Sequence, residues 1–178
     1  QQVGFRVIRS VEIDPVAAET CARHVHGRVD VGDIRRMRPE GRSTVLIAGP
    51  PCQGFSTLGA RRADDPRNSL SLEVVRWAKA LQPKCVVVEN VAAFLDTNEW
   101  MRLVHRLELL EYTVSAFTLD AFDYGTPQRR RRSFTIASRT RPVGVPRRRP
   151  STGTVRDAWE GLPDVPDGVN HHYAPQPS

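Results

Sequence analysis

Val45-Leu46-Ile47-Ala48 runs directly into Gly49-Pro50-Pro51-Cys52-Gln53-Gly54-Phe55-Ser56, and Cys85-Val86-Val87-Val88 runs into Glu89-Asn90-Val91. Continuous β-branched runs of this length predict strands that are buried on both faces. In open α/β sheets, ligands bind beyond the carboxyl ends of such strands. Two successive strand–helix units would also make the strand tips neighbours. We therefore expect the thiol of Cys52 and the carboxylate of Glu89 to face one crevice.

The rest of the chain alternates predicted strands with predicted helices, which indicates an α/β fold. Strands are predicted near residues 6–12, 28–31, 44–48, 84–89, 112–119 and 131–137, and helices near 15–25, 69–81 and 98–110. Beyond Ser138 the chain is rich in Pro, Gly, Arg and Ser, which predicts a linker with one short helical turn near 155–159. The predicted organisation is a core over residues 1–138 and a linker over 139–178.

The composition indicates one soluble domain in a reducing compartment. The chain has 178 residues, of which 39% are hydrophobic, and no apolar run approaches the roughly 18 residues of a membrane span. Three cysteines without a Cys-x-x-Cys pair favour neither a disulfide framework nor a zinc site. No metal is expected at the paired histidines, because no Cys or acid stands at ligand spacing. The predicted location is cytoplasmic, or at the nucleoid in a bacterium.

The excess of positive charge is local. The formal net charge is +6, yet residues 125–150 hold nine arginines and no acidic residue, so removing those nine charges leaves −3. Such a segment suits contact with a phosphate backbone. For the run at 147–149, a solvated loop stays open as the alternative.

Residues 49–56 together with Glu89-Asn90-Val91 resemble the catalytic core of the cytosine-C5 DNA methyltransferases, which use S-adenosylmethionine. Further matches run from Gly4 to about Pro163. The resemblance implies a Rossmann-like methyltransferase fold, with a mostly parallel sheet and helices on both faces. It also implies that Cys52 is the nucleophile and that Glu89 protonates the ring. The implied partner is double-stranded DNA, in a restriction–modification setting.

The chemistry of the reaction explains these two residue types independently. Carbon 5 of cytosine is a poor nucleophile until addition of a thiolate at carbon 6 breaks the aromaticity of the ring. The addition places negative charge on the ring, which an acid beside N3 can neutralise. An isolated Cys52 could instead be a buried and inert thiol, and Glu89 alone could be a helix cap or an ion-pair partner. Their combination favours catalysis.

A third segment, Gln128-Arg129-Arg130-Arg131-Arg132, resembles the Gln-x-Arg-x-Arg segment of the same family. By resemblance, Arg132 touches the cytosine carbonyl and holds Glu89 in place, while Arg130 orients the ring and the nearby phosphate backbone. If residues 130–136 form a strand, alternation places Arg130 and Arg132 on one face. Substrate-binding roles are assigned to Gln53, Ser56, Asn90 and Gln128.

Cofactor positions are expected at two strand ends near the amino terminus. The alternating segment at 5–12 ends in Glu12, whose carboxylate could accept both ribose hydroxyl hydrogens. Asp14 and Pro15 predict a helix start, with Asp14 as the N-cap. By resemblance, Asp33 accepts the adenine amino group, although an Asx turn is the open alternative. The cofactor residues assigned are Glu12, Ile13, Asp33, Ile34, Pro51 and Leu70, the last of which could be a core residue.

Family members also carry segments that find no match in this chain. These are a first strand with a glycine-rich loop that holds the methionine part of the cofactor, and a target-recognition domain. We therefore expect exposed sheet edges, weak DNA binding and slow or no methylation by these 178 residues alone, with the missing pieces fused or supplied by a complementing polypeptide. A tRNA cytosine-C5 methyltransferase and an inactive nucleic-acid-binding remnant remain the alternatives.

Overall fold

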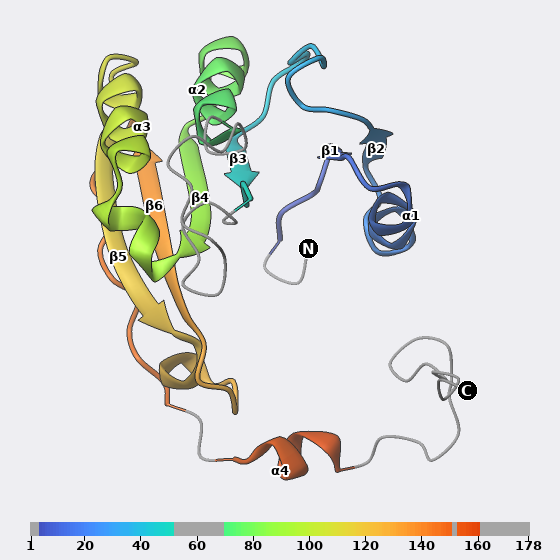
Figure 1. Ribbon diagram of the computed structural model, residues 1–178, viewed down its shortest axis with the longest axis vertical. Helices are drawn as coiled ribbons and strands as arrows, with labels where there is room; N and C mark the ends of the chain where they lie inside the picture. Colours follow the sequence, from blue (N-terminus) through green and yellow to red (C-terminus); the bar gives the residue numbers. More distant parts are fainter. Residues whose placement is uncertain (1–3, 52–69, 151–152, 161–178) are drawn as a thin grey trace. The chain divides into compact units, whose positions relative to one another are not determined.

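The computed structural model describes residues 4–51, 70–150 and 153–160 (Figure 1). The chain divides into two compact units. The larger comprises residues 1–118 and 132–145, and the smaller comprises residues 119–131 and 146–178. Each unit has its own internal contacts.

The first part of the larger unit is a β–α–β arrangement. Strands β1 (Arg9–Glu12) and β2 (Arg28–Val31) pair in parallel, with Glu12 opposite Val31. Helix α1 (Pro15–His24) connects them. Asp14 caps the helix as predicted, because its carboxylate accepts hydrogen bonds from the backbone N–H groups of Val16 and Ala17 at 2.8 and 3.2 Å. Since the two strands are parallel, their carboxyl ends lie at the same edge of the sheet.

A four-stranded sheet follows, in the spatial order β3-β4-β6-β5. It consists of β3 (Val45–Ala48), β4 (Cys85–Val91), β5 (Thr113–Asp120) and β6 (Arg131–Ser138). Strands β3 and β4 run parallel, whereas β6 lies antiparallel to β4. The α/β class and the position of every predicted strand are confirmed, with ends that shift by up to three residues.

The core lies between the sheet and two helices, α2 (Leu70–Leu81) and α3 (Asn98–Glu108). The buried residues of α2 recur every three or four positions, and Leu103 and Leu107 of α3 are four apart, so each helix presents one apolar stripe. A short 3₁₀ helix, η2 (Ala92–Asp96), places Phe94 in the same core. The core cluster contains Val74, Ala78, Val86, Val88, Phe94, Leu103, Leu107, Tyr112 and Ala137.

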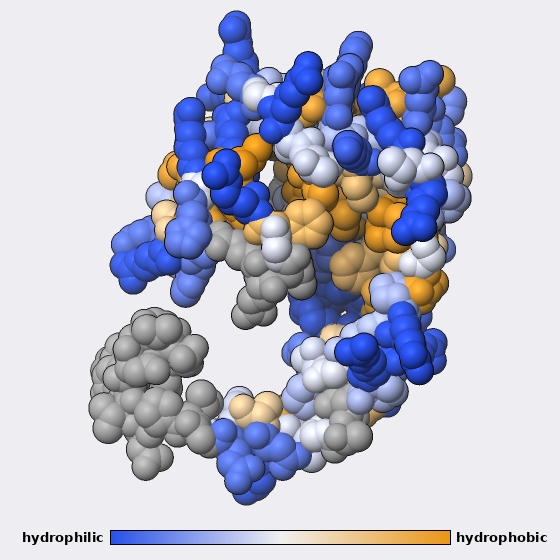
Figure 2. All heavy atoms as spheres, turned by 180° about the vertical axis from the view of Figure 1, so that it is seen from behind, coloured by the Kyte–Doolittle hydropathy of each residue, from blue (hydrophilic) through white to orange (hydrophobic). Residues whose placement is uncertain are grey.

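The prediction that both apolar strands are buried on both faces is wrong. Along β4, buried residues alternate with half-buried ones, and the side chain of Ile47 in β3 is 74% exposed. Of the described helices, α2 and α3 supply the core, and this core includes alternate residues of β4, Val86 and Val88. Seen from the side opposite to that of Figure 1, hydrophobic side chains remain open to view (Figure 2). The second face of the sheet is therefore accessible in the described part of the chain.

The smaller unit contains a 3₁₀ helix, η3 (Ala121–Tyr124), and the short helix α4 (Val155–Trp159). Asp120 caps η3 by accepting a hydrogen bond from the Phe122 N–H, and Gly125 ends it with a φ of 93°, a conformation that glycine adopts without strain. Helix α4 confirms the helical turn predicted near 155–159, and a reciprocal capping box between Thr154 and Asp157 starts it. None of the helices in the described ranges is long and apolar enough to cross a membrane.

Candidate active site

The carboxyl ends of β3 and β4 lie side by side. Ala48 pairs with Val88, and the chain then leaves β3 at Gly49. A Cβ atom on Gly49 would lie 3.8 Å from Oε2 of Glu89. The Asn90 amide donates a hydrogen bond from Nδ2 to the Pro50 carbonyl over 3.4 Å, and its Oδ1 accepts one from the Val91 N–H at 2.8 Å. Asn90 is only 3% exposed, so it fixes the path of the chain as it leaves β3.

Glu89 and Arg132 form an ion pair on one face of the sheet. Glu89 is opposite Phe134 and Arg132 is opposite Val91, so the two residues are diagonal neighbours, two positions apart in the register and on the same face of the sheet. Arg132 Nε lies 3.0 Å from Glu89 Oε1, with the side chains 26% and 38% exposed. The pair is therefore preorganised and still accessible to a ligand. The contact expected between these residues is present.

Three of the assigned site residues, Cys52, Gln53 and Ser56, lie outside the described residues. Pro51 is the last described residue before them and is exposed. Leu70 is the first residue of α2 and is half-buried. Of the other cysteines, Cys85 opens β4, and burial raises the pKa of its thiol, which suits the inert role predicted for it.

The two predicted cofactor acids lie at the same edge of the β1–β2 sheet. Glu12 ends β1, and its backbone carbonyl accepts a hydrogen bond from the Gly32 N–H at 2.8 Å, one residue before Asp33. The Glu12 side chain accepts hydrogen bonds from the N–H groups of Ile13 and Asp14 at 2.7 and 3.2 Å. The neighbouring Ile13 side chain is exposed. Two carboxylates at adjacent strand ends offer hydrogen-bond acceptors that fit the hydroxyl groups of a ribose and an amino group.

Asp33 forms the Asx turn, which the sequence offers as the alternative to a contact with the adenine amino group. Its Oδ1 accepts a hydrogen bond from the Arg35 N–H at 2.9 Å. The Arg35 guanidinium also donates to both carboxylate oxygens, with its Nη2 2.6 Å from Oδ2. These hydrogen bonds lower the pKa of Asp33 to about 2. The turn keeps Asp33 ionised, and an ionised carboxylate can only accept hydrogen bonds, so the turn is compatible with a contact to an amino group.

We expect Arg35→Ala to raise the pKa of Asp33 from about 2 toward its ordinary value of 3.8, because the side-chain hydrogen bonds from Arg35 are the main cause of the shift. The carboxyl ¹³C shift of Asp33, followed by NMR during an acid titration, measures this change. A folded-state pKa below the unfolded value stabilises the protein above the unfolded pKa, and this contribution is lost as pH falls through about 2.

Asp157 is the matched control for that titration. Its pKa is also lowered, but by hydrogen bonds from Thr154 in the α4 capping box. The Asp157 titration should therefore be the same in the wild type and in the Arg35→Ala variant. An unchanged pKa of Asp33 in the variant would show that Arg35 does not hold it.

In the smaller unit, Arg130 precedes β6, which begins at Arg131. Strand alternation therefore does not determine on which face of the sheet the Arg130 side chain lies. Its N–H donates to Asp120 Oδ1 at 3.1 Å, and its carbonyl accepts from the Ala121 N–H at 3.0 Å. These backbone contacts leave the Arg130 side chain exposed, as is that of Gln128. Arg129 packs on the Phe122 ring, with Cζ 4.0 Å from the ring centroid.

The basic run at 147–149 is tied to η3. The Arg149 N–H donates to the Asp123 carbonyl at 2.7 Å, and the Tyr124 hydroxyl donates to the Pro146 carbonyl at 3.3 Å. Arg148 lies 3.7 Å from the Asp123 carboxylate, with its side chain largely exposed. We call residues 146–149 the basic strap. Its backbone is anchored to η3 while its arginine side chains remain exposed.

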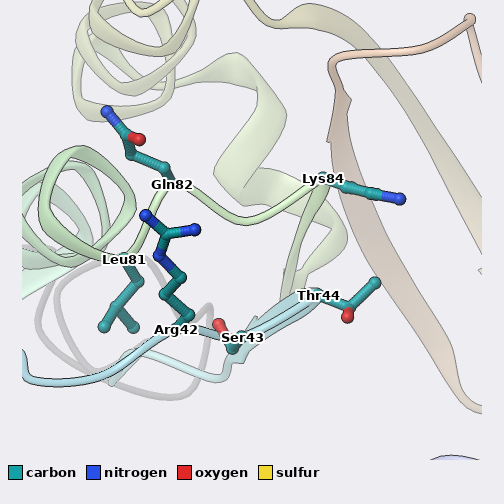
Figure 3. Close-up of a pocket in the computed structure, with 6 residues that line it drawn as sticks. All are labelled: Arg42, Ser43, Thr44, Leu81, Gln82 and Lys84. Carbon is teal, nitrogen blue, oxygen red and sulfur yellow. The ribbon is translucent and has the colours of Figure 1, made fainter.

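A shallow pocket of about 270 Å³ lies at the opposite end of the strands (Figure 3). Its lining residues immediately precede β3 and β4 or end α2; they are Arg42, Ser43, Thr44, Leu81, Gln82 and Lys84. The Lys84 side chain points away from Arg42, so the two cations do not converge (Figure 3). In the described ranges, no group of three His, Cys, Asp or Glu residues could hold a metal ion.

The structure also reveals contacts that the sequence analysis did not anticipate. Arg9 of β1 and Arg76 of α2 both donate to backbone carbonyls in the segment that follows Asp33. The only sequence signal for Arg76 is its position three residues after Glu73 on an otherwise apolar helix, which is typical of an ordinary helical ion pair. The carbonyl contacts are long-range and leave no pattern in the sequence.

Comparisons with known proteins identify the family of this chain. Residues 1–159 match the family described as C-5 cytosine-specific DNA methylase. Type II methyltransferase M.AgeI of Thalassovita gelatinovora is 44% identical in an alignment of 114 positions that covers 60% of this chain and 27% of that protein. Type II methyltransferase M.XorII of Xanthomonas oryzae is 36% identical in an alignment of 183 positions that covers 93% of this chain and 43% of that protein.

Solved structures share the fold. An Escherichia coli prophage protein assigned as a DNA modification methyltransferase superimposes with a TM-score of 0.73 at 28% identity, covering 93% of this chain and 51% of that chain. Spodoptera frugiperda DNMT2 superimposes with a TM-score of 0.62 at 21% identity, covering 80% of this chain and 46% of that chain. The predicted Rossmann-like methyltransferase fold is confirmed. The chain spans less than half the length of the two curated relatives. Because the family match covers residues 1–159 of 178, the chain belongs to the C-5 cytosine-specific DNA methylase family.

Proposed function

We propose that the protein transfers a methyl group from S-adenosylmethionine to carbon 5 of a cytosine flipped out of double-stranded DNA. The observation that carries this proposal is the Glu89–Arg132 ion pair, at 3.0 Å, beside the exit of the chain from β3. Pro50, whose carbonyl is bonded to Asn90, stands only two residues before Cys52. The segment that carries the thiol therefore begins next to the carboxylate.

In the proposed reaction, the Cys52 thiolate adds to carbon 6 of the cytosine, and Glu89 donates a proton or a strong hydrogen bond at N3. Arg132 holds the Glu89 carboxylate and donates to the cytosine carbonyl, for which a guanidinium fork is suited. S-adenosylmethionine supplies the methyl group that carbon 5 accepts. A water molecule would then take the proton from carbon 5, the N3 proton would return to Glu89, and the thiolate would leave carbon 6. These steps restore the aromatic ring as 5-methylcytosine, with S-adenosylhomocysteine as the other product.

The chain's own residues fit the cofactor at the β1–β2 edge. The Glu12 carboxylate would accept the ribose hydroxyl hydrogens, and the ionised Asp33 would accept the adenine amino group. The exposed Ile13, and Ile34, which follows Asp33 in the sequence, would pack against the adenine ring. Pro51 and Leu70 would line the pocket on the side of the methyl donor. Asn90 would act as a positioning residue, because its buried amide is bonded to Pro50 and Val91.

The nucleic acid would meet Gln53, Ser56, Gln128 and Arg130. The exposed arginines of the basic strap would contact its phosphates, because their backbone is anchored to η3 while their charges face solvent. Phosphate contacts position a protein on DNA without reading its sequence.

The decisive experiment incubates the full-length protein with methyl-labelled S-adenosylmethionine and either duplex DNA or tRNA, followed by nucleoside analysis. We expect label in 5-methyldeoxycytidine from the duplex. Label in tRNA alone would replace the proposal with the tRNA enzyme. An absence of transfer together with an absence of S-adenosylmethionine binding in calorimetry would identify an inactive remnant.

A further inference from the structure

Arg76 of α2 uses three guanidinium nitrogens on three different acceptors. Its Nε donates to Glu73 Oε2 at 2.6 Å, within the same helix. Its Nη1 donates to the Met37 carbonyl at 2.9 Å, and its Nη2 donates to the Ile34 carbonyl at 2.5 Å. Glu73 thus orients the guanidinium, and both terminal nitrogens hold the backbone of the turn that follows β2.

A second arginine, Arg9, holds the same segment. Arg9 donates from Nε to Asp30 Oδ2 at 2.6 Å and from Nη1 to the Arg38 carbonyl at 2.9 Å. Trp77 is 6% exposed, and Cζ of Arg9 and of Arg76 lie 5.0 and 6.0 Å from its ring centroid. The backbone of residues 34–38 is therefore tied at three carbonyls to two arginines that both contact one buried indole.

We propose that Arg76 is a positioning residue for cofactor recognition: it fixes the turn that begins at Asp33, so that Asp33 and Ile34 are preorganised to receive the adenine ring. The inference rests on the proposed function, because it takes Asp33 and Ile34 as the adenine contacts. Arg76 touches backbone carbonyls and leaves both recognition side chains unobstructed. A turn that is ordered before binding avoids the entropy cost of ordering it during binding.

The contacts require an arginine specifically. A guanidinium is planar and offers five donors in a fixed fork, so it can bond one carboxylate and two carbonyls at the same time. An ammonium group keeps the charge but lacks this planar geometry. Lysine at this position should therefore hold the turn only in part.

The first arm of the test is amide hydrogen exchange without any cofactor, on the wild-type protein and on Arg76→Ala and Arg76→Lys. Inside the turn, the Arg36 N–H donates to the Asp33 carbonyl, and the Met37 N–H donates to the Ile34 carbonyl. We expect these two amides to exchange about tenfold faster in Arg76→Ala, corresponding to about 1.4 kcal/mol of lost protection. Arg76→Lys should lie between the alanine variant and the wild type.

The second arm measures binding of S-adenosylhomocysteine and of its hypoxanthine analogue by calorimetry. The analogue lacks the amino group that Asp33 would accept. We expect Arg76→Ala to weaken binding of S-adenosylhomocysteine about tenfold and to bring the two dissociation constants closer together. A loss of global stability would weaken both ligands equally and leave their ratio unchanged. Lys79→Ala is the matched control, because Lys79 is an exposed cation on the same helix.

The inference would be overturned if the amides of Arg36 and Met37 exchanged in Arg76→Ala at the same rate as in the wild type. An unchanged ratio of the two dissociation constants would also overturn it. If Arg76→Ala does not fold, Arg76→Lys decides by the same two criteria. A wild-type protein that binds neither ligand would instead refute the proposed function and with it the adenine role of this turn. The exchange arm would then still report whether Arg76 holds the backbone.

Discussion

Replacement of Cys52 by serine in the full-length protein should lower the rate of methyl transfer at least roughly 10³-fold. A serine hydroxyl is far harder to ionise than a thiol near neutral pH, so addition to carbon 6 would fail while the side-chain volume is nearly preserved. Transfer of labelled methyl groups to duplex DNA at saturating S-adenosylmethionine measures the effect. Binding of S-adenosylhomocysteine should remain close to that of the wild type, because Cys52 itself makes none of the proposed cofactor contacts.

Cys85→Ser is the matched control for this experiment. Burial raises the pKa of the Cys85 thiol and thereby disfavours its thiolate. Cys85 also opens β4, whereas Glu89 stands four residues further along the strand, toward its carboxyl end. The control variant should therefore retain wild-type turnover. Substantial turnover by Cys52→Ser, or an equal loss in both variants, would contradict the assignment of Cys52 as the nucleophile.

The regular elements of this chain could be predicted because each depends on a local pattern. Asp14 followed by Pro15 starts α1, because a carboxylate at the N-cap satisfies free N–H groups whatever the rest of the fold does. The apolar runs at 45–48 and 85–88 likewise predict strands from side-chain shape. The position of Glu89 at the carboxyl end of β4 follows from the same run, so its place in the candidate site was predictable.

The burial of those strands was not predictable, because it depends on what covers each face. The sequence of β3 is uniformly apolar, yet Ile47 is largely exposed while Leu46 and Ala48 pack against the core formed with α2 and α3. The apolar sequence predicts the strand, but it does not determine which elements cover the two faces of that strand. The same limit applies to Asn90: its amide could equally have faced a ligand, and only the fold shows that it is buried against the chain at Pro50.

The contacts around Asp33 show a third kind of limit. An Asx turn and an adenine contact stood as alternatives in the sequence, yet the structure shows the turn and leaves the carboxylate ionised at ordinary pH. The Asx turn is therefore compatible with the proposed contact between Asp33 and the adenine amino group. The backbone contacts of Arg76 span about forty positions along the chain, so no local pattern encodes them.

Glu89→Gln should slow methyl transfer roughly 10²- to 10⁴-fold, the range typical of a lost general acid. The amide is nearly isosteric and can still donate a hydrogen bond at N3, but it cannot supply a proton to the charge that develops on the ring. DNA affinity, measured by fluorescence anisotropy at fixed salt, should be nearly unchanged, because the main charge attraction comes from arginines. Glu108→Gln, an exposed position on α3, provides the control and should behave as the wild type.

The ion pair with Arg132 allows a sharper test through a double-mutant cycle. If Arg132 acts mainly by holding the Glu89 carboxylate, at 3.0 Å in the structure, then Arg132→Ala loses much of its effect once Glu89 is already glutamine. The increases in activation free energy of the two single variants would then add up to more than the increase in the double variant. Fully additive effects would mean that Arg132 contributes through the cytosine carbonyl alone. Equal rates for Glu89→Gln and the wild type would remove Glu89 from the reaction altogether.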